Sequence, residues 1–199
     1  MKKAIAAAVI LGCGVVLAQV EDVPRDRAQK FGGILVQTSA EFENLAIKIE
    51  ADAQKTHAIK SKAMAALIIP DRKFSEDRMK SVDKEIVPVG QLWLLKMAPA
   101  KDGKITAEEK LRMVSVKADK EEHQLSLYLL GLRKTEDGRE LLVYAKGKEP
   151  LLTLAVTKAA ETQDLPLRVS GEKAGDNTGR ITINLLGKHK ADFLVMPKD

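Results

Sequence analysis

The chain is 199 residues long and carries 33 Lys and Arg against 28 Asp and Glu, a formal charge of +5, and only 4% of it is aromatic. The two signs of charge are interspersed along the chain, as on surfaces that keep a protein soluble. A nucleic-acid-binding surface needs clustered basic residues with aromatic side chains among them. Because this chain has neither, its composition argues against a nucleic-acid partner.

The first eighteen residues form a bacterial signal-peptide pattern. Lys2 and Lys3 precede an uncharged run over residues 4–18, which ends in the small residue Ala18. A basic start, an apolar centre and a small residue at the cleavage point are typical of secretory signals. The run is shorter than the roughly 20 apolar residues that span a bilayer. The sequence therefore predicts cleavage after Ala18, export, and a mature chain that starts at Gln19, with no membrane span left.

The only cysteine, Cys13, lies within this segment. Cleavage after Ala18 removes it, so the mature chain would have no disulfide, thiol nucleophile or cysteine ligand. An alternative is that residues 10–13 resemble the lipobox of bacterial lipoproteins, whose cysteine becomes a lipidated first residue. Leu11 and the apolar residues 14–18 depart from that pattern. Soluble export to the periplasm, surface or medium is therefore favoured, with a lipid anchor at Cys13 as the alternative.

The segment after the signal, residues 19–84, is expected to be a lead-in and an α/β unit that packs on the rest of the chain. Residues 21–27 are predicted to be a flexible lead-in and residues 31–36 a short strand. A helix is predicted over residues 38–56, where Thr38 and Glu41 match a capping box and apolar residues recur at helical spacing. An alternation of apolar and polar residues over 45–52 competes with it and favours a strand. Residues 63–69 form a second apolar element, and residues 73–84 a loop or short helix.

From residue 85 to residue 199 the sequence predicts a mainly β domain, an antiparallel β-sandwich. Short apolar runs recur with turn residues every 8 to 12 positions, which is typical of a sandwich or barrel. Residues 98–104 are expected to break the pattern with a turn at Asp102 and Gly103. The run at 124–133 is apolar on both faces and is expected at the centre of a sheet, whereas Pro166 indicates an edge strand. The expected strands, about eight, are 86–97, 111–118, 124–133, 140–146, 151–158, 165–170, 181–185 and 192–196.

Residues 102–109 resemble the second half of an EF-hand calcium loop. Asp102, Gly103 and Glu109 fall at loop positions that this resemblance requires. The first two ligand positions fall on Ala98 and Ala100, which have no side-chain oxygen. A turn between strands is therefore the favoured interpretation of this segment.

The sequence lacks the residue spacing of the other catalytic and metal-binding motifs. His57, His123 and His189 lie far apart and form no metal-binding pair, and neither a serine nucleophile elbow nor a phosphate-binding loop occurs. No catalytic, cofactor-binding or metal-binding residue is assigned, and no cofactor is expected. Paired carboxylates brought together by the fold stay open as a possibility.

Two further features have a structural and a functional interpretation. Trp93 is expected in the core, with a ligand groove as the alternative, and Tyr128 and Tyr144 are expected on neighbouring strands. The basic run at residues 186–190 is expected to be a solvated turn, with contact to an anionic envelope polymer as the alternative.

The leading hypothesis is an exported, non-enzymatic β-sandwich protein, a binding or accessory module in the bacterial envelope with a protein or anionic polymer as partner. A first alternative is an exported hydrolase or metal-dependent enzyme whose site is assembled from separate loops. A second is a carbohydrate-binding module, which would display a row of exposed aromatic residues.

Overall fold

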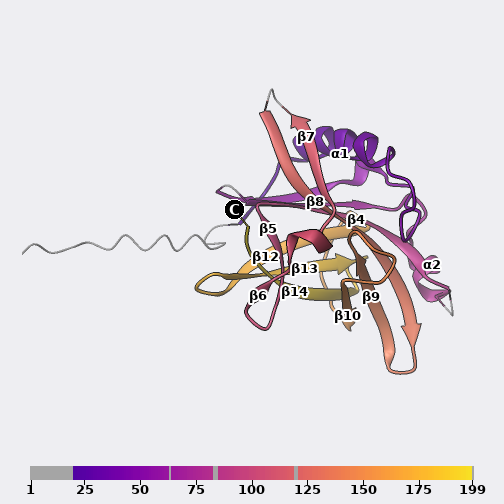
Figure 1. Ribbon diagram of the computed structural model, residues 1–199. Helices are drawn as coiled ribbons and strands as arrows, with labels where there is room; N and C mark the ends of the chain where they lie inside the picture. Colours follow the sequence, from indigo (N-terminus) through magenta and orange to yellow (C-terminus); the bar gives the residue numbers. More distant parts are fainter. Residues whose placement is uncertain (1–19, 63, 83–84, 119–120, 199) are drawn as a thin grey trace, which may run out of the picture.

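The computed structural model describes residues 20–62, 64–82, 85–118 and 121–198. The proposed signal, its cleavage point and Cys13 lie outside these described residues. The protein is mainly β, with two antiparallel sheets packed in a sandwich-like arrangement and few helices, as the sequence predicted. Figure 1 shows α1 (Arg25–Ser39) on one side of the larger sheet and the smaller sheet on the other.

Within the described residues, eight strands form the larger sheet, in the order β1-β2-β3-β4-β8-β9-β10, with β7 also paired to β8. The central strand, β8, pairs with β4 along one side, and with β7 and then β9 along the other. This confirms the central position expected for residues 124–133. The bounds are β1 Glu21–Asp22, β2 His57–Ser61, β3 Met64–Pro70, β4 Val87–Leu95, β7 Met113–Ala118, β8 Glu121–Thr135, β9 Gly138–Tyr144 and β10 Leu152–Ala155.

The smaller sheet has the order β12-β13-β14-β5-β6, with β11 paired to β14. Its first strand, β12, is an edge strand and follows Pro166 directly, as expected. The chain passes from the larger to the smaller sheet at Lys96, whose φ of 54° turns the backbone between β4 and β5. The bounds are β5 Met97–Lys101, β6 Lys104–Ile105, β11 Thr157–Lys158, β12 Leu167–Gly175, β13 Thr178–Leu185 and β14 His189–Pro197.

The expected break at residues 98–104 is wrong in its extent. Residues 97–101 form β5, and only Asp102 and Gly103 form the turn to β6, both with positive φ. Asp-Gly is a preferred pair for such a two-residue hairpin turn. The EF-hand resemblance therefore falls on a β-hairpin followed by the short 3-10 helix η2 (Glu108–Lys110).

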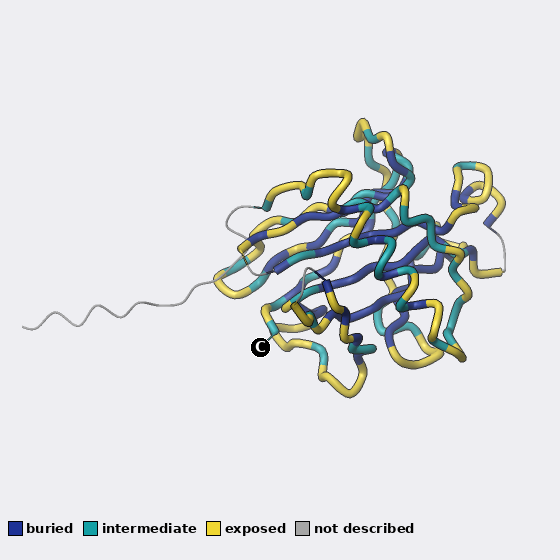
Figure 2. Tube along the Cα trace, turned by 90° about the horizontal axis from the view of Figure 1, so that it is seen from above, coloured by how far each residue is buried: buried dark blue, intermediate teal, exposed yellow. Residues whose placement is uncertain are grey.

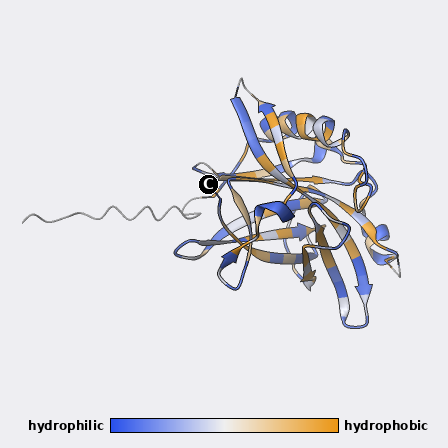
Figure 3. Cartoon of the chain, in the orientation of Figure 1, coloured by the Kyte–Doolittle hydropathy of each residue, from blue (hydrophilic) through white to orange (hydrophobic). Residues whose placement is uncertain are grey.

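The main hydrophobic core lies between the two sheets. Leu92, Leu94 and Leu130 of the larger sheet are fully buried there against Ile183 and Val169 of the smaller one. Figure 2 shows buried residues following the strands, and Figure 3 shows hydrophobic residues along the same strands and hydrophilic ones at the hairpin ends. Strand alternation produces this pattern, because successive side chains point to opposite faces.

The opposite face of the larger sheet is covered by α1 and by residues 40–52. The buried residues of α1, Ala28, Gly32, Leu35 and Ser39, recur at helical spacing along one side. Gly32 is required there because a Cβ would lie 2.1 Å from Oγ1 of Thr56. The predicted strand at residues 31–36 and the flexible lead-in at 21–27 are therefore wrong: these residues form β1 and most of α1.

The helix predicted over residues 38–56 is also wrong. Thr38 lies near the end of α1, and its hydroxyl donates to the Ile34 carbonyl (3.0 Å) instead of capping a new helix. Residues 40–52 then cross the sheet without regular structure, with Leu45, Ile47 and Ile49 packed against it. Only the 3-10 helix η1 (Ala53–Lys55) follows.

Two shorter elements of the N-terminal part agree with expectation. The apolar element predicted over residues 63–69 corresponds to β3, with residue 63 outside the described residues, and residues 73–84 contain the short helix α2 (Glu76–Lys80). The strands β1, β2 and β3 share the larger sheet with β4 and β8. Residues on both sides of position 85 therefore build one sheet.

Candidate functional site

A cavity of about 450 Å³ lies between the N-terminal part of α1 and the larger sheet. Its walls come from α1, from β2, β3 and β4, and from the hairpin of β7 and β8, which Figure 1 shows beside α1. Most of the lining is apolar: Val23, Pro24, Ala28, Phe31, Leu35, Ala58, Met64, Ala65, Leu67, Leu95, Val116, Ala118 and Leu125.

The floor of the cavity is a row of side chains across four paired strands. Lys60 on β2 lies opposite Ala65 on β3, Ala65 lies opposite Leu95 on β4, and Leu95 lies opposite Leu125 on β8. Residues paired across a sheet point to the same face. The small side chain of Ala65 in the middle of this row leaves the space that a larger residue would fill.

The hairpin of β7 and β8 forms a second wall. Val116 on β7 lies opposite His123 on β8, and both residues line the cavity. Val116 is almost fully buried, whereas His123 keeps about a third of its side chain exposed, with Nε2 3.9 Å from a Glu121 carboxylate oxygen. The wall therefore changes from apolar to polar toward the end of the hairpin.

Three cationic side chains and one carboxylate line the cavity: Arg27, Lys60 and Lys62 against Glu121. The Arg27 guanidinium lies 5.7 Å from the centre of the Phe31 ring. Lys60 Nζ lies 3.9 Å from a Glu21 carboxylate oxygen, a contact between exposed groups. Lys62, in the turn between β2 and β3, has no ion pair with any described residue.

At the other end of α1 the same face of the sheet is closed by a buried hydrogen-bond network. Gln91 Nε2 donates to Ser39 Oγ (3.0 Å), and Trp93 Nε1 donates to Gln91 Oε1 (3.1 Å). All three residues are buried. Trp93 is thus a core residue, as expected, and it does not line the cavity. The network fixes the C-terminal end of α1 to β4.

The aromatic residues do not form a binding surface. Tyr128 and Tyr144 lie on the neighbouring strands β8 and β9, as predicted, and both are buried. All seven aromatic side chains of the chain are among the described residues, and each is buried or only partly exposed. The row of exposed rings that the carbohydrate-binding alternative requires is therefore missing.

The three histidines lie in three separate places. His57 sits where β2 meets β12: its Nδ1 accepts from the Val169 amide (3.3 Å), and Nε2 lies 3.5 Å from an Asp22 carboxylate oxygen. Burial lowers the pKa of His57, against the opposing effect of Asp22. Burial also lowers the pKa of His189, at the start of β14. Of the three histidines, all of which the structure describes, His123 lines the cavity and His57 and His189 do not, so the cavity does not unite them as the hydrolase hypothesis requires.

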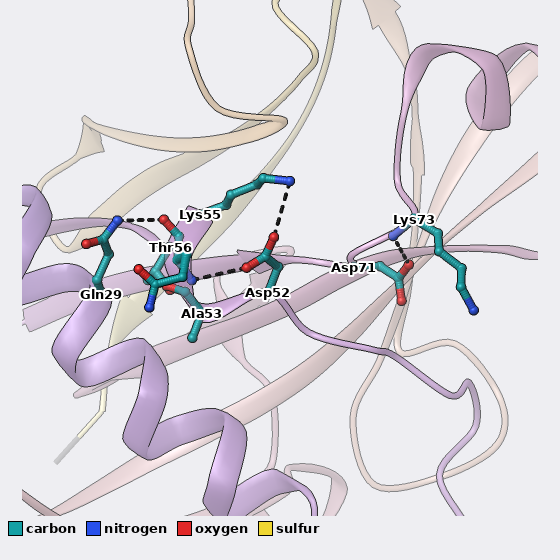
Figure 4. Close-up of polar contacts among 8 residues, drawn as sticks. Gln29, Asp52, Ala53, Lys55, Thr56, Asp71 and Lys73 are labelled. Atoms are coloured by element: carbon teal, nitrogen blue, oxygen red, sulfur yellow. Dashed lines mark hydrogen bonds and ion pairs between the residues drawn. The ribbon is translucent and has the colours of Figure 1, made fainter.

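The carboxylates near η1 have structural partners. Asp71 accepts from the amides of Lys73 (2.9 Å) and Glu50 (2.7 Å), and Asp52 accepts from the Gln54 amide (3.2 Å). Figure 4 shows Asp52 beside η1 and Asp71 with its partner Lys73. They hold residues 50–55 in place without forming an open site. In the part of the chain that the structure describes, no group of three or more histidine, cysteine or acidic residues is placed to hold a metal.

The basic run at residues 186–190 forms the hairpin between β13 and β14. Leu186 and Gly187 have positive φ values, as a tight turn requires. Lys188 Nζ lies 2.7 Å from a carboxylate oxygen of Glu76 on α2. The charge of Lys188 is therefore already paired within the protein, which supports the interpretation as a turn.

No residue of the cavity was predicted from the sequence, because its lining comes from five strands and a helix that no local pattern brings together. The helical spacing of Ala28, Phe31 and Leu35 after Pro24 was the one local signal that could have placed α1 correctly. Comparisons with models of protein families, with curated proteins and with solved structures found no match. No helix among the described residues is both long enough and apolar enough to cross a membrane.

Proposed function

We propose that the chain is an exported, non-enzymatic binding module of the bacterial envelope that holds a small hydrophobic ligand in the cavity beneath α1. The cavity is the observation that supports this proposal. Its volume of about 450 Å³ falls in the range of small-molecule sites, roughly 300–1,000 Å³. Its predominantly apolar lining with a few polar groups is also typical of such sites.

The chemistry of the lining favours binding over catalysis. Among the residues that the structure describes, the cavity is lined by one histidine and one carboxylate, His123 and Glu121, and by no hydroxyl or thiol side chain. Covalent catalysis through serine, threonine or cysteine needs such a nucleophile next to a base. The lining residues instead offer surface that gains free energy when it contacts another apolar surface and releases water.

Binding can be tested with the neutral fluorescent probe N-phenyl-1-naphthylamine. The purified protein is expected to bind it with increased fluorescence, and Ala65→Phe is expected to weaken binding at least about tenfold by filling the floor. Ala155→Phe, on an exposed position of β10 in the same sheet, is the matched control and should bind like the wild type.

A second variant keeps the proposal testable if Ala65→Phe does not fold. Leu95→Trp changes a partly exposed position in the same row and should also reduce binding. Circular dichroism verifies the fold of each variant. Probe affinity that is equal in the wild type and both folded cavity variants would contradict the proposed site.

The proposal that the protein is exported is based on the sequence pattern, and it is tested separately. The protein is expressed with its native start in a bacterial host, and the intact mass of the product is measured in each cell fraction. A periplasmic product that starts at Gln19 is expected. An acylated product that starts at Cys13 would replace soluble export with a lipid anchor, and uncleaved protein in the cytosol would contradict both.

A further inference from the structure

We infer that the ligand of this cavity is a single-chain amphiphile with an anionic head group. The inference rests on the proposed function and adds the chemical class of the ligand. It depends on two properties of the cavity: a floor that is apolar from Ala65 to Leu125, with Lys60 at its edge, and an excess of positive charge among the described polar groups around it.

The floor favours a hydrocarbon chain over a peptide. Ala65, Leu67, Leu95 and Leu125 provide no donor or acceptor there, and their backbone groups are already paired within the sheet. A peptide would bring amide and carbonyl groups that need hydrogen-bond partners when they are buried. An acyl chain has no such groups, so it can fill this space without an unsatisfied polar atom.

The cationic side chains lie where an anionic head group would reach water. Lys60 is near the end of β2 and Lys62 is in the following turn, and both are exposed. Arg27 reaches the cavity from the first half of α1. Among the described lining residues, Glu121 is the one anionic group, and it lies on the opposite wall near His123. A negative head group is attracted by this arrangement and a cationic one is repelled.

The N-terminal end of α1 adds to this positive potential. Pro24 occupies the N-cap position, lines the cavity, and makes no side-chain hydrogen bond to the helix. The uncapped amides of the first turn carry the positive end of the helix dipole. Asp26 in that turn offsets part of the effect, so the three cationic side chains remain the main determinant.

The test is displacement of N-phenyl-1-naphthylamine by amphiphiles with the same chain and different head groups. Dodecanoate and dodecyl phosphate are expected to displace the probe at concentrations at least about tenfold lower than dodecyltrimethylammonium, each used below its micellar concentration. The ratio of the two anions distinguishes a fatty-acid ligand from a phosphate-bearing lysolipid. Added salt should weaken displacement by the two anions, because it screens the charges, and should leave the binding affinity of the neutral probe unchanged.

Charge reversal at the cavity gives the decisive variant. Arg27→Glu combined with Lys62→Glu is expected to weaken displacement by dodecanoate about tenfold more than it weakens binding of the neutral probe, because only the anion loses an attractive charge. The matched control, Lys134→Glu with Lys173→Glu, makes the same change in net charge at exposed positions outside the cavity and should preserve the anion preference.

The possible failures are distinguishable. If the probe binds but anions displace it no better than the cation, the ligand class is wrong and the proposed function stands. If the charge-reversed protein keeps the wild-type preference, Arg27 and Lys62 do not select the head group and the inference is overturned. If the probe does not bind the wild-type protein at all, the proposed function itself fails.

Discussion

The two faces of the larger sheet are built differently, although they alternate residue by residue along the same strands. The face toward the smaller sheet is closed at its centre, where Leu92, Leu94 and Leu130 are fully buried. The face toward α1 is closed where α1 and residues 40–52 pack on it, as at the network of Ser39, Gln91 and Trp93. Beyond that point, Ala65 and Leu95 stay partly accessible in the cavity.

Because of this difference, we expect stability and ligand binding to depend on different residues of the sheet. A sheet face that packs against another sheet over its whole length leaves no space for a ligand. The other face is covered by one helix and the irregular residues 40–52, and the part of the face beside the N-terminal end of α1 stays open. Residues of the closed face should therefore determine the free energy of unfolding, and residues of the open end should determine ligand affinity.

Substitutions of the neighbours Leu94 and Leu95 test the difference between the two faces most directly, because the two residues have the same side chain on the same strand. Leu94→Ala should lower the free energy of unfolding by about 3–5 kcal/mol, since it creates a void between the sheets. Leu95→Ala should lower it by only about 1 kcal/mol, because its side chain is already partly exposed to the cavity. Chemical denaturation measures both values, and equal losses would contradict the comparison.

The Gln91 network should have the next largest effect. Gln91→Leu leaves the Trp93 Nε1–H without a partner in a buried place and removes the donor to Ser39 Oγ, which should cost about 2 kcal/mol. The Ser39 hydroxyl keeps its hydrogen bond to the Val36 carbonyl. Because Ser39→Ala removes part of the same network, the two changes should not be additive in the double variant. Additive losses in denaturation experiments would show that the three residues do not act as a unit.

His57 should make stability depend on pH. Its pKa in the folded protein is lowered by burial from the ordinary value of 6.5, whereas Asp22 and Asp164 raise it and Arg168 lowers it further. The unfolded chain therefore binds the proton first, and the free energy of unfolding falls as the pH drops below 6.5. Protonation of Nδ1 also opposes the Val169 amide that donates to it.

The comparison is between wild type, His57→Asn and the control His123→Asn, each unfolded with denaturant across pH 5 to 8, about the range where histidine titrates. His57→Asn should have the shallowest dependence, with the remainder owed to His189, whose pKa is also lowered by burial. If the free energy of unfolding of His57→Asn depends on pH as steeply as that of the wild type, this assignment is contradicted.

The smallest effect is expected at Glu76, on the surface. Hydrogen bonds from Lys188 and Lys80 lower the pKa of its carboxyl group to about 2. The small stabilisation that results is present above the ordinary value of 4.5 and is lost as the pH falls toward 2. Lys188→Ala should raise this pKa, as an NMR titration of the carboxyl carbon would show, and leave the melting temperature nearly unchanged because the pair is exposed.

The strands after residue 85 were predictable because alternation is a local signal. Residues 124–133, apolar on both faces, correctly indicated the central strand β8, and Pro166 correctly indicated an edge. The N-terminal part was not predictable in the same way. Gly32 looks like a residue that ends a helix, yet it is inside α1 because Thr56, twenty-four positions later, packs against it.

The cavity depends on pairings that no local pattern contains. Lys60, Ala65, Leu95 and Leu125 form one row only after β2, β3, β4 and β8 have paired in this register. The sequence could show that Lys60 and Ala58 share a face of a strand. It could not show that a helix would cover only part of that face.

Methyl NMR spectra recorded with and without saturating dodecanoate test the central claim most directly. Resonances of Ala58, Ala65, Leu95 and Val116 should shift on binding, while those of Leu92, Leu130 and Ile183 between the sheets should not. Shifts confined to residues outside the cavity, or no shifts at any concentration below the micellar limit, would contradict the assignment of the open end of this sheet face as the binding site.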